Sequence, residues 1–121
     1  IEPCANTQYG PEFKDAILFI EDIAEAPYRV DRMLTSLWLR GCLSELKGLV
    51  IGDFRLPKPD STPDERPDFS MEEVFDHLSS WIQVPIFSGL YAGHIPDKLT
   101  LPIGAEVEID ADAKTLRFIS A

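Results

Sequence analysis

Two residues in this sequence have the types and settings that acid–base chemistry needs, Glu21 and His94. Glu21 ends the apolar run 16–20, which is short enough for a buried strand, and a carboxylate at the end of such a strand is held rigidly. His94 follows Gly93 in a predicted turn, where the bent backbone leaves its side chain clear to reach a site. A carboxylate can fix the tautomer of a histidine and stabilise the imidazolium as it forms. The sequence therefore offers a candidate base and a candidate acid to orient it.

Both residues also have plainer interpretations. Acids that precede a helix favour its positive N-terminal end, and Glu25, just before Pro27, fits that role well. Glu21 fits the two interpretations equally, and a histidine in a loop is often incidental. Neighbouring strand residues point to opposite faces, so Glu21 and Asp22 cannot share one role.

The sequence shows no nucleophile for such a pair to activate. No serine lies in a G-x-S-x-G elbow, and Ser70 is explained by capping of a helix. Cys4 and Cys42 lack an electropositive setting that would make a reactive thiolate, and Cys42 fits a small core residue. His77 fits a helix surface. We therefore expect the nucleophile to lie on another segment.

A charged cluster occupies one predicted helix, formed by Arg29, Asp31, Arg32 and Arg40. One interpretation is a solvated face with local ion pairs, each worth about 0.3–0.5 kcal/mol. The other is docking against another domain, or recognition of a substrate carboxylate by an arginine fork.

Hydrophobic periodicity predicts an α/β domain that has a mixed sheet, crossover helices and a C-terminal antiparallel hairpin. Apolar runs predict strands at 16–20, 49–54 and 84–90, with a further short strand possible at 100–101. Helices are expected from Pro27 to Gly41, with Val30, Met33, Leu34, Leu37 and Trp38 in its buried stripe, and from the capping box at Ser70 to Ile82. Residues 105–109 and 115–119 alternate as a hairpin, 1–15 are expected to be irregular, and the proline-rich stretch 56–69 is expected to be a surface loop.

Length and composition limit the kinds of protein this can be. At 121 residues and 45% apolar content, the chain fits one domain with a real core. A net charge of −10 argues against nucleic acid as a partner, and no polybasic segment is present to hold a membrane. The two cysteines form no disulfide framework and have no zinc-ligand spacing.

Several longer motifs occur together in one order. They are ILFIEDIAEAPYRVDRML at 17–34, Leu37, Gly41, GLVIGDF at 48–54, Pro85-Ile86, Gly89-Leu90, Gly93-His94 and TLPIG at 100–104. In these motifs the chain resembles the C-terminal domain of the LD-carboxypeptidase family of serine peptidases. That family includes the muramoyl-tetrapeptide carboxypeptidases and the microcin C immunity peptidases.

The resemblance implies a swivelling β/β/α domain and two members of a Ser-Glu-His triad. By motif match the acid is Glu21, with Glu25 in reserve, and the base is His94. The serine and the oxyanion donors belong to the family's N-terminal domain, so residues 1–121 are expected to be the C-terminal domain alone. Neither a cofactor nor a metal is implied.

The resemblance also implies an activity. The parent protein would cleave an amide next to a C-terminal D-amino acid of a murein tetrapeptide, whereas this chain alone would be inactive. The alternatives are an immunity-type peptidase acting on an acyl-nucleotide peptide antibiotic, and a non-catalytic α/β interaction module. The expected partners are the N-terminal domain and a peptide substrate, with a homodimer left open. We expect a cytoplasmic location, with export left open because the sequence begins at Ile1.

The sequence departs from the family pattern in three places. Ala24 stands where the family usually has glycine, the proline-rich stretch around 57–67 is enlarged, and a Gly-Gly-Asn segment expected upstream of the first strand is missing. These departures leave the match of Glu21 and His94 in place but bear on the choice of substrate, because loops shape pockets.

Overall fold

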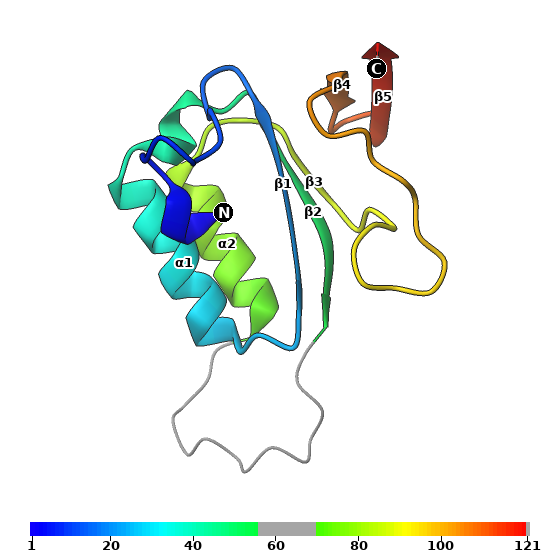
Figure 1. Ribbon diagram of the computed structural model, residues 1–121. Helices are drawn as coiled ribbons and strands as arrows, with labels where there is room; N and C mark the ends of the chain where they lie inside the picture. The colour runs from blue at the N-terminus through cyan, green and yellow to red at the C-terminus, as the bar shows by residue number, and fades with distance from the viewer. Residues whose placement is uncertain (56–69, 121) are drawn as a thin grey trace.

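The computed structural model describes residues 1–55 and 70–120 and arranges them in three layers (Figure 1). Two α-helices cover one face of a parallel sheet, and the C-terminal segment with its hairpin lies on the other side. In chain order the elements are η1 (Glu2–Cys4), β1 (Ile17–Ile23), α1 (Pro27–Leu39), η2 (Cys42–Glu45), β2 (Gly48–Arg55), α2 (Met71–Trp81), β3 (Ile86–Ser88), β4 (Glu106–Asp110) and β5 (Thr115–Ser120).

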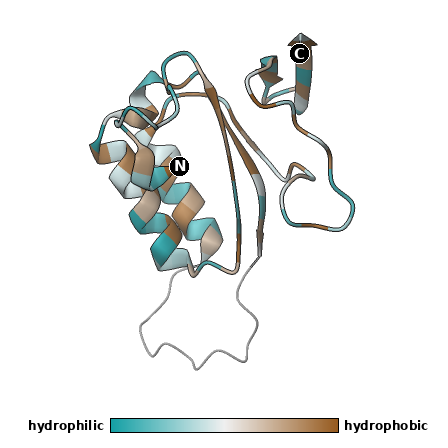
Figure 2. Cartoon of the chain, in the orientation of Figure 1, coloured by the Kyte–Doolittle hydropathy of each residue, from teal (hydrophilic) through white to brown (hydrophobic). Residues whose placement is uncertain are grey.

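The sheet has the order β1-β2-β3, with both neighbouring pairs parallel. Leu18, Leu49 and Ile51 belong to one buried cluster with the apolar stripes of α1 and α2. Phe19 lies on the opposite face, where its ring is next to Gly52. β1 and β2 begin with apolar runs, at residues 17–20 and 49–51 (Figure 2), as expected for strands of a parallel sheet covered on both faces.

The helices bury the stripes that their spacing predicts, with one exception. Val30, Leu34 and Leu37 of α1 and Val74 and Leu78 of α2 are all buried, and each such aliphatic side chain contributes about 1.5–3 kcal/mol on burial. The exception is Trp38, which was expected in the buried stripe but is 43% exposed. Its ring stacks on Trp81 of α2 at 5.0 Å between centroids, so it covers the edge of the helix pair instead of entering the core.

Local signals in the sequence account for the ends of the helices. Pro27 occupies the first turn of α1, where a missing N–H costs nothing, and Gly41 follows the helix at a φ of +78°. Ser70 and Glu73 form a reciprocal capping box at the start of α2, as predicted. Cys42 is 2% exposed, which confirms it as a core residue.

The structure confirms the mixed α/β fold and differs from the sequence prediction in several details. β1 continues past residue 20 to Ile23, so Glu21 lies inside the strand. The stretch 1–15 contains η1 and contributes Ala5 and Phe13 to the core. Residues 100–101 form no strand, and β4 and β5 form a sheet of their own. The predicted loop at 56–69 lies outside the described residues.

Among the residues that the structure describes, no helix has the length and apolar character to cross a bilayer.

We predict that Ser70→Ala destabilises the fold by about 1 kcal/mol near neutral pH, because it removes the N-cap of α2. Hydrogen bonds from the Ser70 backbone N–H and side chain lower the pKa of the Glu73 carboxyl, so the capping box stabilises the fold above the ordinary glutamate pKa. That contribution is lost as pH falls through the lowered pKa. The difference between variant and wild type, measured by denaturant unfolding, should therefore shrink in acid.

The matched control is Ser79→Ala, because the Ser79 hydroxyl donates to the Asp76 carbonyl inside the same helix. A loss at Ser79 as large as that at Ser70 would contradict the assignment of the cap.

Candidate active site

Glu21 and His94 are in direct contact, although 73 positions separate them in the chain. Glu21 Oε2 lies 3.0 Å from His94 Nδ1. The side chain of Glu21 is 24% exposed, whereas that of His94 is 62% exposed. The carboxylate is thus embedded at the sheet, and the imidazole stands on its outer side.

An irregularity in the sheet lies opposite Glu21. Ile20 pairs with Ile51 and Asp22 pairs with Phe54, so Glu21 alone faces two residues of β2, Gly52 and Asp53. Such a bulge bends its strand and re-aims nearby side chains. The Asp53 N–H, within this bulge, donates to the Ala92 carbonyl at 3.2 Å.

The loop that carries His94 is tied to β2 at several points. The N–H groups of Gly89 and Leu90 donate to the Ile51 carbonyl at 3.1 and 3.4 Å, and Ala92 is 2% exposed. The Leu99 N–H donates to the Tyr91 carbonyl at 2.7 Å and closes the loop. His94 is therefore exposed yet carried on a backbone with fixed ends.

Two glycines make the approach of this loop to the sheet possible. A Cβ on Gly93 would lie 2.8 Å from Glu21 Oε2, and Gly93 has a φ of +119°, which other residues rarely adopt. A Cβ on Gly52 would lie 2.8 Å from the Ala92 carbonyl oxygen and 2.9 Å from the ring of Phe19. Because glycine has no Cβ, the loop and the sheet can come into contact at both positions.

Sequence reasoning did not single out the bulge at Gly52 and Asp53. A signal for it was present, because glycine inside an apolar strand often marks a bulge or a close backbone approach. Its partner, the Ala92 carbonyl, is a backbone group that no side-chain pattern reveals.

The acids around Glu21 differ in their surroundings. Glu25 Oε2 lies 3.5 Å from Nη1 of Arg29, four residues later in the chain, and forms a local ion pair with it. Burial, and then the charges of Glu25 and Glu21, raise the pKa of the Asp22 carboxyl. The structure thus brings Glu21 to His94 and gives Glu25 a different partner.

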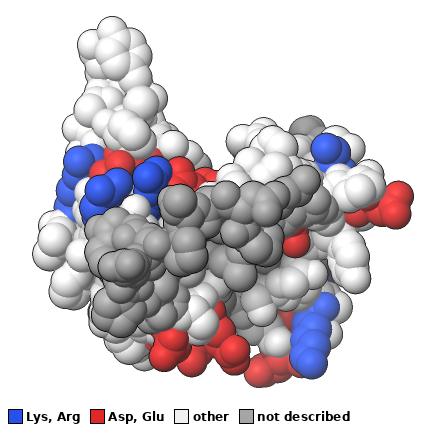
Figure 3. All heavy atoms as spheres, turned by 90° about the horizontal axis from the view of Figure 1, so that it is seen from below, with Lys and Arg blue, Asp and Glu red and all other residues white. Residues whose placement is uncertain are grey.

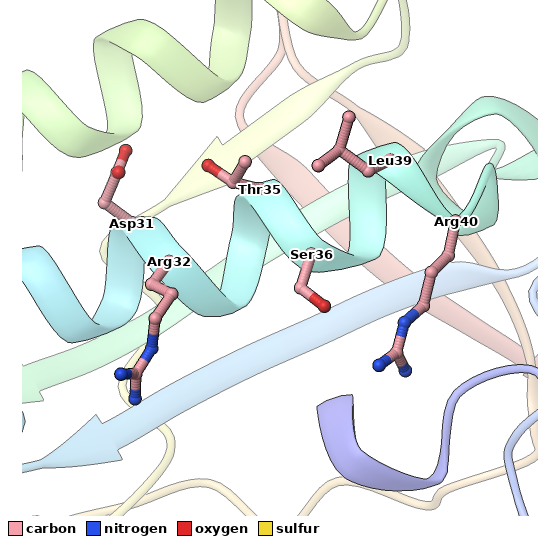
Figure 4. A pocket seen from close by; sticks show the side chains of 6 residues that line it. All are labelled: Asp31, Arg32, Thr35, Ser36, Leu39 and Arg40. Carbon is pink, nitrogen blue, oxygen red and sulfur yellow. The ribbon is translucent and has the colours of Figure 1, made fainter.

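The other residues considered from the sequence lie on the helices. His77 is exposed on α2, as predicted, 3.6 Å from Asp31 and against the ring of Trp81. Arg29 and Arg40 make ion pairs, and acidic and basic atoms lie side by side in Figure 3. An open groove of about 540 Å³ runs along α1 (Figure 4), lined by Asp31, Arg32, Thr35, Ser36, Leu39 and Arg40.

The geometry of the pair suits general base chemistry. When Nδ1–H donates to the carboxylate, Nε2 is left as the acceptor of an imidazole that is largely exposed. Within residues 1–55 and 70–120, no hydroxyl or thiol is hydrogen-bonded to His94, and no group of three or more His, Cys, Asp or Glu side chains could hold a metal ion. The described part therefore brings an imidazole and a carboxylate together in the arrangement that a base and its orienting acid require.

We predict that Gly93→Ala destabilises the fold by more than Gly104→Ala. Both positions have positive φ, so both variants incur backbone strain of about 1–3 kcal/mol. Only the Gly93 variant also forces a methyl group against Glu21, since a Cβ on Gly104 meets open space. Equal losses in the free energy of unfolding would contradict the close approach described here.

We also predict that Ala24→Gly stabilises the fold by about 0.5–1 kcal/mol. Ala24 follows β1 with a φ of +67°, where a Cβ is strained and glycine is not. Ala16→Gly is the control, because Ala16 lacks a positive φ and should lose stability through added chain entropy. A loss of stability at both positions, measured by denaturant unfolding, would contradict the strain at Ala24.

Comparison with known proteins places this chain in a family. The family model described as the LD-carboxypeptidase C-terminal domain matches residues 1–109. A putative carboxypeptidase from Synechocystis is 36% identical over 114 residues, which are 94% of this chain and 37% of that protein.

Solved structures agree with the sequence comparison. The muramoyltetrapeptide carboxypeptidase from Oxalobacter formigenes superposes with a TM-score of 0.75 at 38% identity, covering 88% of this chain and 36% of its own. The microcin C7 self-immunity protein MccF, known from Escherichia coli, superposes with a TM-score of 0.76 at 27% identity, covering 95% of this chain and 33% of its own. The chain thus spans about a third of the length of these relatives. It belongs to the LD-carboxypeptidase family, as a C-terminal domain of that family.

Proposed function

We propose that the protein to which this chain belongs is a serine carboxypeptidase in which Glu21 and His94 are two members of a Ser-Glu-His triad. The observation that carries the proposal is the 3.0 Å contact between Glu21 Oε2 and His94 Nδ1. The nucleophilic serine would come from the N-terminal domain, since the described residues offer His94 no hydroxyl partner. The exposed side of the imidazole is where such a group would arrive.

In this proposal each residue has a defined task. His94 Nε2 accepts the proton of the serine hydroxyl as the serine oxygen attacks the substrate carbonyl. Glu21 accepts the hydrogen bond from Nδ1 and stabilises the imidazolium formed in that step. The imidazolium then gives its proton to the departing amine, and water releases the acyl group by the same path in reverse.

For the substrate, we propose a murein tetrapeptide that is cut next to its C-terminal D-amino acid. The support is the name of the Oxalobacter relative, a muramoyltetrapeptide carboxypeptidase, which is 38% identical to this chain. The alternative is an acyl-nucleotide peptide antibiotic. MccF, which has been solved with glutamyl sulfamoyl guanosine, supports that alternative at 27% identity. The higher identity favours the murein peptide.

We predict that His94→Ala in the full-length protein lowers kcat for murein tetrapeptide hydrolysis by about three to six orders of magnitude. Glu21→Gln should lower it by about four orders, because the amide supports the wrong tautomer of His94. His77→Ala is the matched control and should keep full activity, since His77 lies on the surface of α2. Steady-state kinetics on folded variants measure all three.

The outcomes separate the candidate functions. Normal turnover by His94→Ala would exclude the triad. Hydrolysis of an aminoacyl sulfamoyl adenylate but not of the tetrapeptide would favour the immunity-type peptidase. If the wild-type full-length protein hydrolyses neither, the domain is better described as a non-catalytic interaction module. Residues 1–121 alone should turn over neither substrate.

A further inference from the structure

The loop that carries His94 leaves β2 at one residue and returns to it two residues later. Ile51 of β2 pairs with Ser88, the last residue of β3, and the Ile51 carbonyl accepts a hydrogen bond from the Gly89 N–H at 3.1 Å. The return is made at Asp53, whose N–H donates to a carbonyl of the loop at 3.2 Å. The loop is thus bound to β2 at both of its ends.

The carbonyl at the point of return is that of Ala92. In an uninterrupted parallel ladder, the Asp53 N–H would meet the carbonyl of Gly89, three residues earlier. Residues 89–91 are therefore looped out of the ladder. Ala92 is 2% exposed, so the point of return is buried, and His94 is only the second residue after it.

Residues 92–94, the crossing segment, run over the sheet from β2 to β1. A Cβ on Gly52 of β2 would lie 2.8 Å from the Ala92 carbonyl oxygen, and a Cβ on Gly93 would lie 2.8 Å from Glu21 Oε2 of β1. Neighbouring strands are about 4.8 Å apart and one residue spans about 3.5 Å, so a crossing of two or three residues leaves little slack. The height of the crossing segment above the sheet is therefore set at Gly52, before the chain reaches the acid.

We propose that Gly52 is a positioning residue for the proposed reaction. Because it has no Cβ, the Ala92 carbonyl can lie directly against β2, and this sets the distance between His94 Nδ1 and Glu21 Oε2. Gly52 acts through the backbone of residues 92 and 93. The inference rests on the proposed function, because the distance matters for catalysis only if His94 is the base.

A methyl group at position 52 cannot be accommodated by the movement of one side chain. It would lie 2.9 Å from the ring of Phe19, which can turn, but also 2.8 Å from the Ala92 carbonyl, which is backbone. The crossing segment must then rise from β2. N–H···O bonds extend to about 3.2 Å, so the 3.0 Å contact between His94 and Glu21 would be lengthened or lost. Without that bond, the carboxylate no longer selects the tautomer of His94 that carries its proton on Nδ1.

The experiment compares Gly52→Ala with Gly48→Ala in the full-length protein. Gly48 is the matched control, because it begins the same strand, also lacks a positive φ, and would bring its Cβ closest to a side chain, that of Ile109 at 3.1 Å. Selective ¹⁵N labelling of histidine rings reports the tautomer of each neutral imidazole by NMR. The variants His94→Ala and His77→Ala assign the signals.

The wild type and Gly48→Ala should both show His94 with its proton on Nδ1. Gly52→Ala should shift His94 to a mixture of the two tautomers, whereas His77, exposed on α2, should be unchanged in all three proteins. In Gly52→Ala, kcat for the tetrapeptide should fall by about ten-fold or more with KM changed less, because a misplacement of about 1 Å can cost about a hundred-fold. A merely structural role would lower the unfolding temperature and leave the tautomer and kcat per folded molecule unchanged.

An unchanged His94 tautomer in Gly52→Ala would overturn the proposal, and so would an equal change in Gly48→Ala or a shifted tautomer with full kcat. If Gly52→Ala does not fold, its combination with Phe19→Leu decides, measured against Phe19→Leu alone, because the smaller side chain leaves the carbonyl as the remaining close contact. If the wild type has no peptidase activity, the proposed function fails by itself, and the tautomer of His94 still tests the role of Gly52.

Discussion

The close approach of Glu21 and His94 is the constraint on which the site depends. A carboxylate in a sheet and an imidazole in a loop can meet at 3.0 Å only if nothing stands between the loop and the sheet. Gly93 and Gly52 meet that requirement, one beside the carboxylate and one beneath the Ala92 carbonyl. The Asp53 N–H of β2 donates to that carbonyl and anchors the loop. The contact of the two side chains thus depends on the close approach of the loop backbone at Gly93 and the strand backbone at Gly52.

The two faces of the sheet have different tasks. One face, with Leu18, Leu49 and Ile51, packs against α1 and α2 and supplies most of the buried apolar area. The other face carries Phe19 and Glu21 and receives the loop of His94. The helix side makes the sheet rigid, and rigidity on that side is what lets a half-exposed pair keep its geometry. The residues that stabilise the fold and the residues of the proposed chemistry therefore lie on opposite faces of the same sheet.

Much of the fold could be predicted from the sequence, because its signals are local. The stripe of α1, the cap at Ser70 and the alternation of the hairpin each follow from spacing within about ten residues. Glu21 and His94 were singled out from their settings and from the family motifs. Their contact, across 73 positions, is a property of the tertiary fold. The contact of Arg40 with the Glu2 carbonyl and the bond of Asp53 to the Ala92 carbonyl escaped prediction for a similar reason, since both join groups that are remote in the chain.

The position of Glu21 within β1 also limits how the gene for this protein can change. Side chains along a strand alternate with a period of two, so a single inserted codon between the start of β1 and Glu21 would exchange the faces of every residue between them. The acid would then point at the helices, and an aliphatic side chain would face the imidazole. Single substitutions in β1 leave the direction of the other side chains unchanged, whereas an insertion or deletion of one residue before Glu21 reverses it. Related proteins should therefore vary freely in the loops before Ile17 while keeping the number of residues from Ile17 to Glu21 unchanged.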